Sequence, residues 1–297
     1  MLNVAVNPAK VPALRFERSP GYWQTVARRL LRDPVAVSAA LVVLGLLVLA
    51  VFGPSLVPGD PYQSSMLKRL KPIGFEGHLL GTDELGRDML SRLMVGARLS
   101  LFMGITPVVC AFVIGSVIGI VAGYAGGATN TVIMRTVDVF YAFPSVLLAI
   151  ALSGALGAGI TNSLISLTIV FIPPIARVAE SVTTQIRGRD FVDAARASGA
   201  SAFTIVRVHV LGNVLGPIFV YATSLIAVSM ILASGLSFLG LGVKPPEPEW
   251  GLMLNTLRTA IYVQPWVAAL PGAMIFVTSV AFNLLSDGLR SAMEIRS

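Results

Sequence analysis

Residues 187–213 read RGRDFVDAARASGASAFTIVRVHVLGN, a polar segment with four arginines in a chain that is otherwise largely apolar. Asp190 is a candidate helix cap and Gly199 a candidate stop, so the segment predicts a short helix that ends in a left-handed turn. Ser201 can begin a second short helix. The apolar side of this second helix is predicted to contain Phe203, Val206 and Val210. We expect the segment to form a docking surface on the cytoplasmic side.

The composition of the whole chain indicates an integral membrane protein. Hydrophobic residues make up 55% of the 297 residues, charged residues make up 12%, and the mean hydropathy is +0.80. Soluble domains contain about 25% charged residues. The net charge of +7 could suggest a nucleic-acid partner. The basic residues instead lie mainly at the ends of apolar runs, where they orient membrane spans, so no nucleic acid is expected.

Several chemical functions find no motif in the sequence. Cys110 is the only cysteine, so there is no disulfide framework or Cys-x-x-Cys pair, and we expect it to be a buried apolar residue. His78 and His209 lack ligand-like spacing to acidic residues, so no metal site is assigned. No glycine-rich loop ends in Lys-Ser or Lys-Thr, the pattern of a phosphate-binding loop. If ATP drives this protein, another subunit must hydrolyse it.

The N-terminal third is predicted to contain one membrane span and one extracytoplasmic segment. Residues 1–33 are expected to form a basic tail and, after a helix start at Ser19-Pro20, an amphipathic helix on the inner membrane face. The alternative to this helix is a simple charged flank of the first span. Residues 34–57 are long enough to cross a hydrocarbon layer of about 30 Å. Residues 58–98 are expected outside. Their Lys and Arg residues count against this orientation, which the later loops nevertheless require.

A core of five helices is expected over residues 99–290. Its first span carries a small residue at every fourth position, a pattern that allows close helix packing in lipid. This stripe consists of Ala111, Gly115, Gly119 and Gly123. The inner turn follows at 124–130.

Two further crossings are expected between Asp138 and Arg177, with an outer turn at 153–162. Asp138 could be a transport carboxylate, because a charge inside a membrane is costly and tends to be functional. The favoured interpretation is two local ion pairs, Arg135 with Asp138 and Arg177 with Glu180, each three residues apart on one helix.

The last two spans flank a second outer loop. The fifth span is predicted to begin at Pro217 and to end near Leu239. The outer loop covers 241–262, where three prolines stiffen the chain and Trp250 suits the membrane interface. The last span is expected over 260–286, followed by a cytoplasmic tail at 291–297 with Arg290 and Arg296 close to the inner face. The sequence therefore predicts an all-α fold with about six spans and both termini cytoplasmic.

Four separated motifs resemble one family. Asp193-Ala194-Ala195, Gly199 and Leu211 stand at the spacing of the "EAA" loop by which ABC importer permeases engage their ATPase subunits. Asp193 replaces the usual Glu, and Gly212 replaces the final Pro. The stretch from His78 to Leu101 resembles the start of the conserved part of the second permease subunit of dipeptide and oligopeptide importers. Its matching residues are Gly81, Thr82, Asp83, Gly86, Arg87 and Asp88. The structural alternative for these residues is a helix cap at Asp83 and surface charges at Arg87 and Asp88.

Two further stretches complete the resemblance. Residues 236–254 match the same permeases, and residues 283–290 look like the family's C-terminal ending. The outer-loop motif contains Pro245, Pro246, Trp250 and Gly251. This loop could face an external binding protein, or simply close the outer end of the helix bundle.

The resemblance implies an all-α, MetI-like type I ABC importer permease of the bacterial inner membrane. It implies a heterodimer with a second permease, two cytoplasmic ATPase subunits that bind ATP and Mg²⁺, an extracytoplasmic solute-binding protein, surrounding lipid and transport by alternating access. The residues expected to contact the ATPase are Asp193, Ala194, Ala195, Arg196, Gly199, Ala200, His209 and Leu211. The alternative for Asp193 and Gly199 is a capping box and a helix end with no partner.

The predicted substrate is a dipeptide or oligopeptide. Relatives with these motifs also handle nickel chelates, glutathione or oligosaccharides, and the sequence does not separate these classes. A rival from another class is a stand-alone ion-coupled transporter, which needs binding groups near the bilayer midplane, commonly in two related halves. We find no such repeat. An intramembrane enzyme is disfavoured because no nucleophile, base and metal ligands occur together.

Overall fold

The computed structural model describes residues 22–293, and every regular element in that range is helical. The predictions for the basic tail, for Ser19-Pro20 and for Arg296 lie outside this range. Short 3₁₀ turns occur at Met66–Lys68 and Ala260–Tyr262, and a π-helical turn occurs at Val206–Val210. The α-helices are α1 (Tyr22–Leu30), α2 (Pro34–Leu56), α3 (Met89–Ala125), α4 (Gly127–Tyr141), α5 (Ser145–Leu156), α6 (Ile160–Arg187), α7 (Asp190–Ala197), α8 (Ala202–Ile205), α9 (Leu211–Phe238), α10 (Trp250–Thr256) and α11 (Pro265–Met293).

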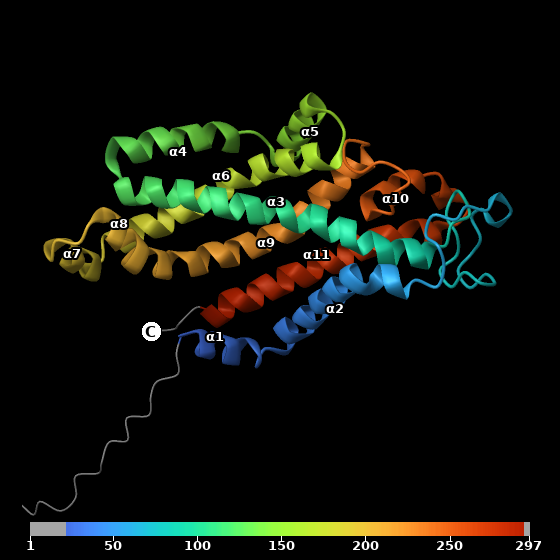
Figure 1. Cartoon of the computed structure of the whole chain (residues 1–297), viewed down its shortest axis with the longest axis horizontal. Coiled ribbons are helices and arrows are strands. Elements are labelled where there is room, and N and C mark those ends of the chain that lie inside the picture. Colours follow the sequence, from blue (N-terminus) through green and yellow to red (C-terminus); the bar gives the residue numbers. More distant parts are fainter. Residues whose placement is uncertain (1–21, 294–297) are drawn as a thin grey trace, which may run out of the picture.

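The number of candidate membrane spans agrees with the expectation of about six. Within the described range, five helices are long and apolar enough to cross: α2, α3, α6, the continuous helix over 202–238, and α11. A sixth crossing results if α4 and α5, which meet at a bend of 85°, are one broken span. The long helices run side by side along the longest axis of the molecule (Figure 1). Helices α1, α7 and α8 and the end of α11 lie at the same end (Figure 1).

The small-residue stripe of α3 packs closely against another helix, as predicted, and that helix is α6. A Cβ atom at Gly115 would lie 3.0 Å from the carbonyl oxygen of Ile172, one at Gly119 would lie 2.3 Å from that of Ala176, and one at Gly123 would lie 2.7 Å from that of Glu180. Only a hydrogen side chain allows the two backbones to approach this closely, and this contact provides van der Waals packing where lipid supplies no hydrophobic driving force. The α3–α6 pair forms the most extensive helix contact in the described chain.

Two span boundaries differ from the predictions. Helix α3 begins at Met89, ten residues before the expected start of the core, because Asp88 caps it by accepting a hydrogen bond from Ser91 N at 2.7 Å. Pro217 lies inside α9 and does not start a helix. The helix continues without interruption from Ala202 through the π-helical turn into α9. Any displacement of α8 is therefore transmitted directly to a membrane span.

The predicted ion pairs within single helices are wrong. Asp138 of α4 pairs with Arg177 of α6, and Glu180 accepts hydrogen bonds from Asn130 Nδ2 at 2.7 Å and Thr184 Oγ1 at 3.1 Å. Helices α4 and α6 pack against each other, so a partner on the neighbouring helix replaces the one three residues away.

Cys110 also differs from its prediction, because it is exposed on the surface of α3. A helix whose apolar residues can face either lipid or protein gives no periodic signal for which side is buried.

Candidate functional site: the docking segment and the outer closure

The docking segment, residues 187–213, is shaped by a turn at Gly199. Gly199 has a φ of +81°, in the left-handed region that favours glycine. Its N–H donates to the carbonyl of Arg196 at 3.0 Å, and Ala200 N–H donates to that of Ala195 at 3.1 Å. These two bonds form a Schellman motif, which satisfies the carbonyls at the end of α7. The predicted stop at Gly199 is confirmed.

The second half of the segment also begins as predicted. The side-chain oxygen of Ser201 accepts a hydrogen bond from Thr204 N at 3.2 Å and so caps α8. Asp190 does not cap α7, because Arg189 occupies that position and Asp190 lies in the first turn. There its negative charge still interacts favourably with the positive end of the helix dipole.

Buried apolar side chains hold the docking segment on the bundle. Val192 of α7, Ile205 of α8 and Val210 of the π-helical turn are all buried in the main core cluster. The end of α6 is tied to the end of α3 by Arg187, whose Nη1 donates to the carbonyls of Gly123 at 3.3 Å and Tyr124 at 3.2 Å. The segment is therefore a packed part of the fold.

The opposite face of the segment exposes apolar side chains. Phe203 is 74% exposed and Val208 is 61% exposed. Phe191 is 43% exposed, and its ring centre lies 6.4 Å from that of His209. Helical spacing puts Phe203 on the same side as Val206 and Val210. Val210 and Ile205 are buried, whereas Phe203 is exposed and points away from the bundle. Large exposed apolar side chains in this segment mark a candidate contact for another protein.

The predicted ATPase-contacting residues divide into two groups. Asp193, Ala194, Arg196 and Gly199 are exposed, and the Asp193 carboxylate pairs with Arg196 Nη1 at 2.8 Å. The remaining four are partly buried against the chain itself: Ala195, Ala200, His209 and Leu211. Phe203 and Val208 were not predicted to be candidate contact residues, although both are exposed. The signal that could have found them is the position of two large apolar side chains in an otherwise polar segment.

At the other end of the molecule, three charged residues form a buried network. Asp83 is 2% exposed and Arg87 is 5% exposed, so the interpretation of Arg87 as a surface charge is wrong. Arg87 Nε donates to Asp83 Oδ2 at 2.6 Å, and Arg92 Nε lies 3.2 Å from the same oxygen. Arg92 also donates to the carbonyls of Pro61 at 3.1 Å and Pro246 at 3.4 Å. The network thus joins the segment before α3 to the outer loop.

The rest of the 81–88 motif supports this network. Gly81 and Gly86 have φ angles of +78° and +74°, and a Cβ at Gly86 would lie 1.9 Å from the carbonyl oxygen of Ser65. Thr82 is fully buried, donates to the carbonyl of Lys68 and accepts from Lys71 N. Asp88 caps α3 and contacts His78 Nδ1 at 3.0 Å. All six motif residues are therefore used to fold the outer segment.

The outer loop folds onto α3. Trp250 is fully buried, contrary to its predicted position at the membrane interface, and its Nε1 donates to the carbonyl of Leu93 at 3.0 Å. A Cβ at Gly251 would lie 2.4 Å from the carbonyl oxygen of Ser234, so this glycine allows α10 to contact α9. Pro245 and Pro246 are exposed at the loop tip. The loop therefore closes this end of the bundle, and its proline tip is exposed.

Glu249 caps α10 inside this closure. Its carboxylate accepts hydrogen bonds from Gly251 N and Leu252 N at 2.8 Å each, and from Ser100 Oγ at 3.4 Å. Burial raises the pKa of Glu249, although these hydrogen bonds oppose the shift. No group of three or more His, Cys, Asp or Glu side chains within residues 22–293 is arranged to hold a metal ion.

Comparison with known families gives matches to both the core and the N-terminal span. The family model described as "Binding-protein-dependent transport system inner membrane component" matches residues 115–296. The chain belongs to this family. A second model, "N-terminal TM domain of oligopeptide transport permease C", matches residues 21–72, which include α2. This chain is therefore a permease of an ABC importer and a multi-pass membrane protein.

Individual relatives agree with the family assignment. The chain is 41% identical over 286 residues to the glutathione transport system permease protein GsiD of Pectobacterium atrosepticum, covering 96% of this chain and 95% of the relative. It is 42% identical over 284 residues to the protein of the same name from Escherichia coli O157:H7, covering 96% and 94%. Among solved structures, a chain of the inward-facing MetNI methionine ABC transporter matches with a TM-score of 0.57 and 20% identity, covering 69% of this chain and 97% of that chain. This structural similarity supports the fold alone.

Proposed function

We propose that this permease imports short peptides of the glutathione class, as one half of a heterodimeric pathway served by two ATPase subunits and a solute-binding protein. The observation that carries the substrate class is the identity of 41–42% with permeases named for glutathione transport, which extends over 96% of the chain. Glutathione is itself a small modified peptide. The proposed substrate class therefore lies within the dipeptides and oligopeptides expected from the sequence motifs, and is narrower.

The docking segment supplies the mechanical part of the proposal. In this proposal its exposed side chains Phe203, Val208 and Phe191 contact the ATPase, and its buried side chains hold it on the bundle. Because α8 continues into α9 as one helix, closure of the ATPases on ATP and Mg²⁺ displaces a membrane span and changes access to the pathway. ATP shifts this equilibrium only through its different affinities for the two conformations.

The proposed orientation places the docking segment, α1 and the end of α11 in the cytoplasm of a bacterial cell, and residues 57–88 with α10 outside. The common position of the first three elements at one end of the molecule supports it (Figure 1). This chain holds no phosphate-binding loop, so ATP hydrolysis falls to the partner subunits.

The test is uptake by the reconstituted transporter. Proteoliposomes that contain both permeases, both ATPases and the binding protein are expected to accumulate labelled glutathione when ATP is inside. Unlabelled linear dipeptides and a nickel chelate serve as competitors, and full competition by a linear dipeptide would reassign the substrate.

A second experiment addresses the rival class of ion-coupled transporters. The charged groups between α4 and α6 form the Asp138–Arg177 pair and the hydrogen-bonded Glu180, which leaves no free carboxylate there for a coupling ion. Uptake should therefore survive an ionophore that collapses proton and sodium gradients. It should stop when the ATPases are omitted.

A further inference from the structure

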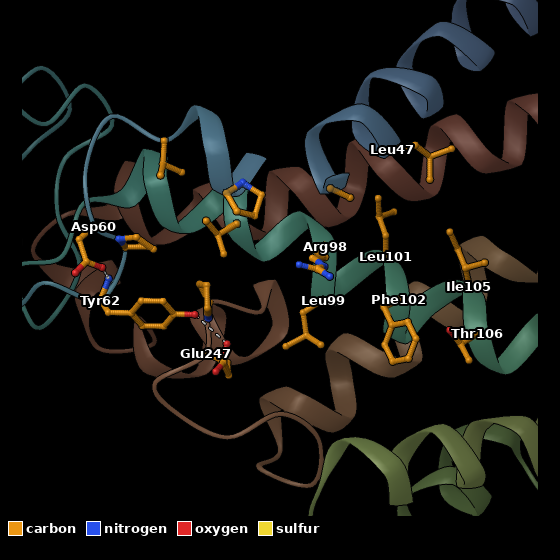
Figure 2. Close-up of a pocket in the computed structure, with 16 residues that line it drawn as sticks. Leu47, Asp60, Tyr62, Arg98, Leu99, Leu101, Phe102, Ile105, Thr106 and Glu247 are labelled. Atoms are coloured by element: carbon orange, nitrogen blue, oxygen red, sulfur yellow. Dashed lines mark hydrogen bonds between the residues drawn. The ribbon is translucent and has the colours of Figure 1, made fainter. Parts of the chain in front are cut away.

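A large cleft lies between α2, α3 and the outer loops, far from the docking segment. Its volume is about 900 Å³, near the upper limit of the roughly 300–1,000 Å³ usual for ligand pockets. We call it the outer cleft. Its polar end is formed by Asp60, Tyr62, Arg98 and Glu247. Figure 2 shows Asp60, Tyr62 and Glu247 at one end and Leu47, Phe102 and Ile105 at the other, with Arg98 between them.

The polar end carries one cation and two anions. The side chain of Tyr62 donates a hydrogen bond from Oη to Glu247 Oε2 at 3.1 Å, and its N–H donates to Asp60 Oδ1 at 2.8 Å. Arg98 is exposed, and its guanidinium makes no hydrogen bond or ion pair within residues 22–293. An Arg guanidinium presents a planar fork of donors that matches the oxygens of a phosphate. The rim thus offers a phosphate site beside two carboxylates.

The apolar end continues along the two spans. From Arg98, at the polar end, to Thr106, the α3 wall is about 12 Å long at a rise of about 1.5 Å per residue. One leaflet of a bilayer has a hydrocarbon thickness of roughly 15 Å, half of about 30 Å. Leu47 is 40% exposed and Phe102 is 48% exposed along this wall. The cleft therefore covers most of the hydrocarbon thickness of one leaflet and has the polarity order of a lipid, with charged groups at one end and apolar side chains below them.

We propose that the outer cleft binds one glycerophospholipid whose phosphate is next to a primary ammonium group. Its phosphate lies on Arg98, its ammonium group lies between Asp60 and Glu247, and an acyl chain lies against Leu47, Phe102 and Ile105. A primary ammonium group donates hydrogen bonds to carboxylates, which a quaternary ammonium group cannot do. An anionic headgroup without an amine leaves the two carboxylates uncompensated. The bound lipid would fix the spacing of α2 and α3 at their outer ends.

The experiment measures lipid binding to the complete purified transporter by native mass spectrometry. The delipidated complex is titrated with dioleoyl phosphatidylethanolamine, dioleoyl phosphatidylcholine and dioleoyl phosphatidylglycerol as probes. The wild type is expected to bind one phosphatidylethanolamine more tightly than either of the other lipids. Arg98→Gln should weaken this site by about tenfold or more, because it removes a charged contact with the phosphate.

Two matched variants distinguish the site from general lipid binding. Leu47→Trp fills the apolar end from an exposed position and should abolish the tight site without disturbing the core. Arg258→Gln removes another exposed arginine, one that does not line the cleft, and should leave binding unchanged.

Equal affinity for the three lipids, or unchanged binding in both Arg98→Gln and Leu47→Trp, would overturn the proposal. A photoreactive amino acid in place of Phe102 gives a further readout. Its cross-link to phosphatidylethanolamine supports the site, whereas a cross-link to the second permease shows that a protein helix fills the cleft and also overturns it. Neither result depends on which solute the transporter carries.

Discussion

A substitution series at Gly199 tests whether the turn in the docking segment transmits work. The φ of Gly199 is +81°, and a Cβ built there meets nothing within 4 Å. Replacement by Asn, Ala or Val therefore acts through the backbone conformation and not through a steric clash. Gly212 is the matched control, because its surroundings are equally open and it lies in the regular part of α9.

The expected size of the effect follows from the cost of the left-handed conformation. For an alanine this cost is roughly 1–2 kcal/mol, so Gly199→Ala reduces the ratio of turned to unturned segment by about 5- to 30-fold. Asn tolerates the conformation better than Ala, and a β-branched Val tolerates it less. The expected order of coupling is Gly, then Asn, then Ala, then Val. Gly212→Ala favours the helix by up to about 1 kcal/mol and should not reduce coupling.

The assay is the number of substrate molecules imported per ATP hydrolysed in proteoliposomes that hold the complete transporter. Each variant is first measured for its amount in the membrane and for retention of the ATPase subunits. Wild-type coupling in Gly199→Val would refute the reasoning. An equal loss in Gly212→Ala would refute it as well, because the defect would then not arise from the left-handed turn.

Three further substitutions test the packing and the charges. Gly119→Leu places a Cβ 2.3 Å from the carbonyl oxygen of Ala176, so we expect the free energy of unfolding to fall by about 1–3 kcal/mol and the unfolding temperature in detergent to fall with it. Gly45 lies in open space, so Gly45→Leu should change neither quantity. Reversing the charge of either Asp138 or Arg177 alone should lower the resistance of the protein to proteolysis, and exchanging the two charges in a double variant should restore it. A double variant that does not recover would contradict the ion pair between α4 and α6. Because burial raises the pKa of Glu249, the native state binds its proton at pH values where the unfolded chain has lost it. The free energy of unfolding should therefore fall as pH rises above the ordinary carboxyl pKa of 4.5, and Glu249→Gln should flatten that slope in thermal unfolding of the purified complex.

The local features of the docking segment were predictable because they depend on residues that are close in sequence. A glycine after a short helix signals a left-handed turn, and Ser201 signals a cap, so both appear in the structure where the sequence placed them. The small-residue stripe of α3 also predicted close packing, although the sequence did not identify α6 as its partner.

Other features depend on which helices become neighbours. Trp250 is a residue type that favours the membrane interface, but the outer loop folds back and buries it against Leu93. Phe203 and Val210 share one side of the helix by spacing, yet Val210 is buried and Phe203 is exposed. No pattern within one helix distinguishes these outcomes, because protein-facing and lipid-facing sides of a membrane helix are both apolar.

Several membrane spans, a polar segment that interrupts them and a turn at Gly199 are predictable from the residues alone. Composition, charge position and local backbone preference are enough for these conclusions. The pairing of Asp138 with Arg177 and the shared burial of Asp83, Arg87 and Arg92 depend instead on how the helices pack. The reason is physical: an ion pair depends on the distance between two side chains in space, and helix packing sets that distance for residues far apart in the chain.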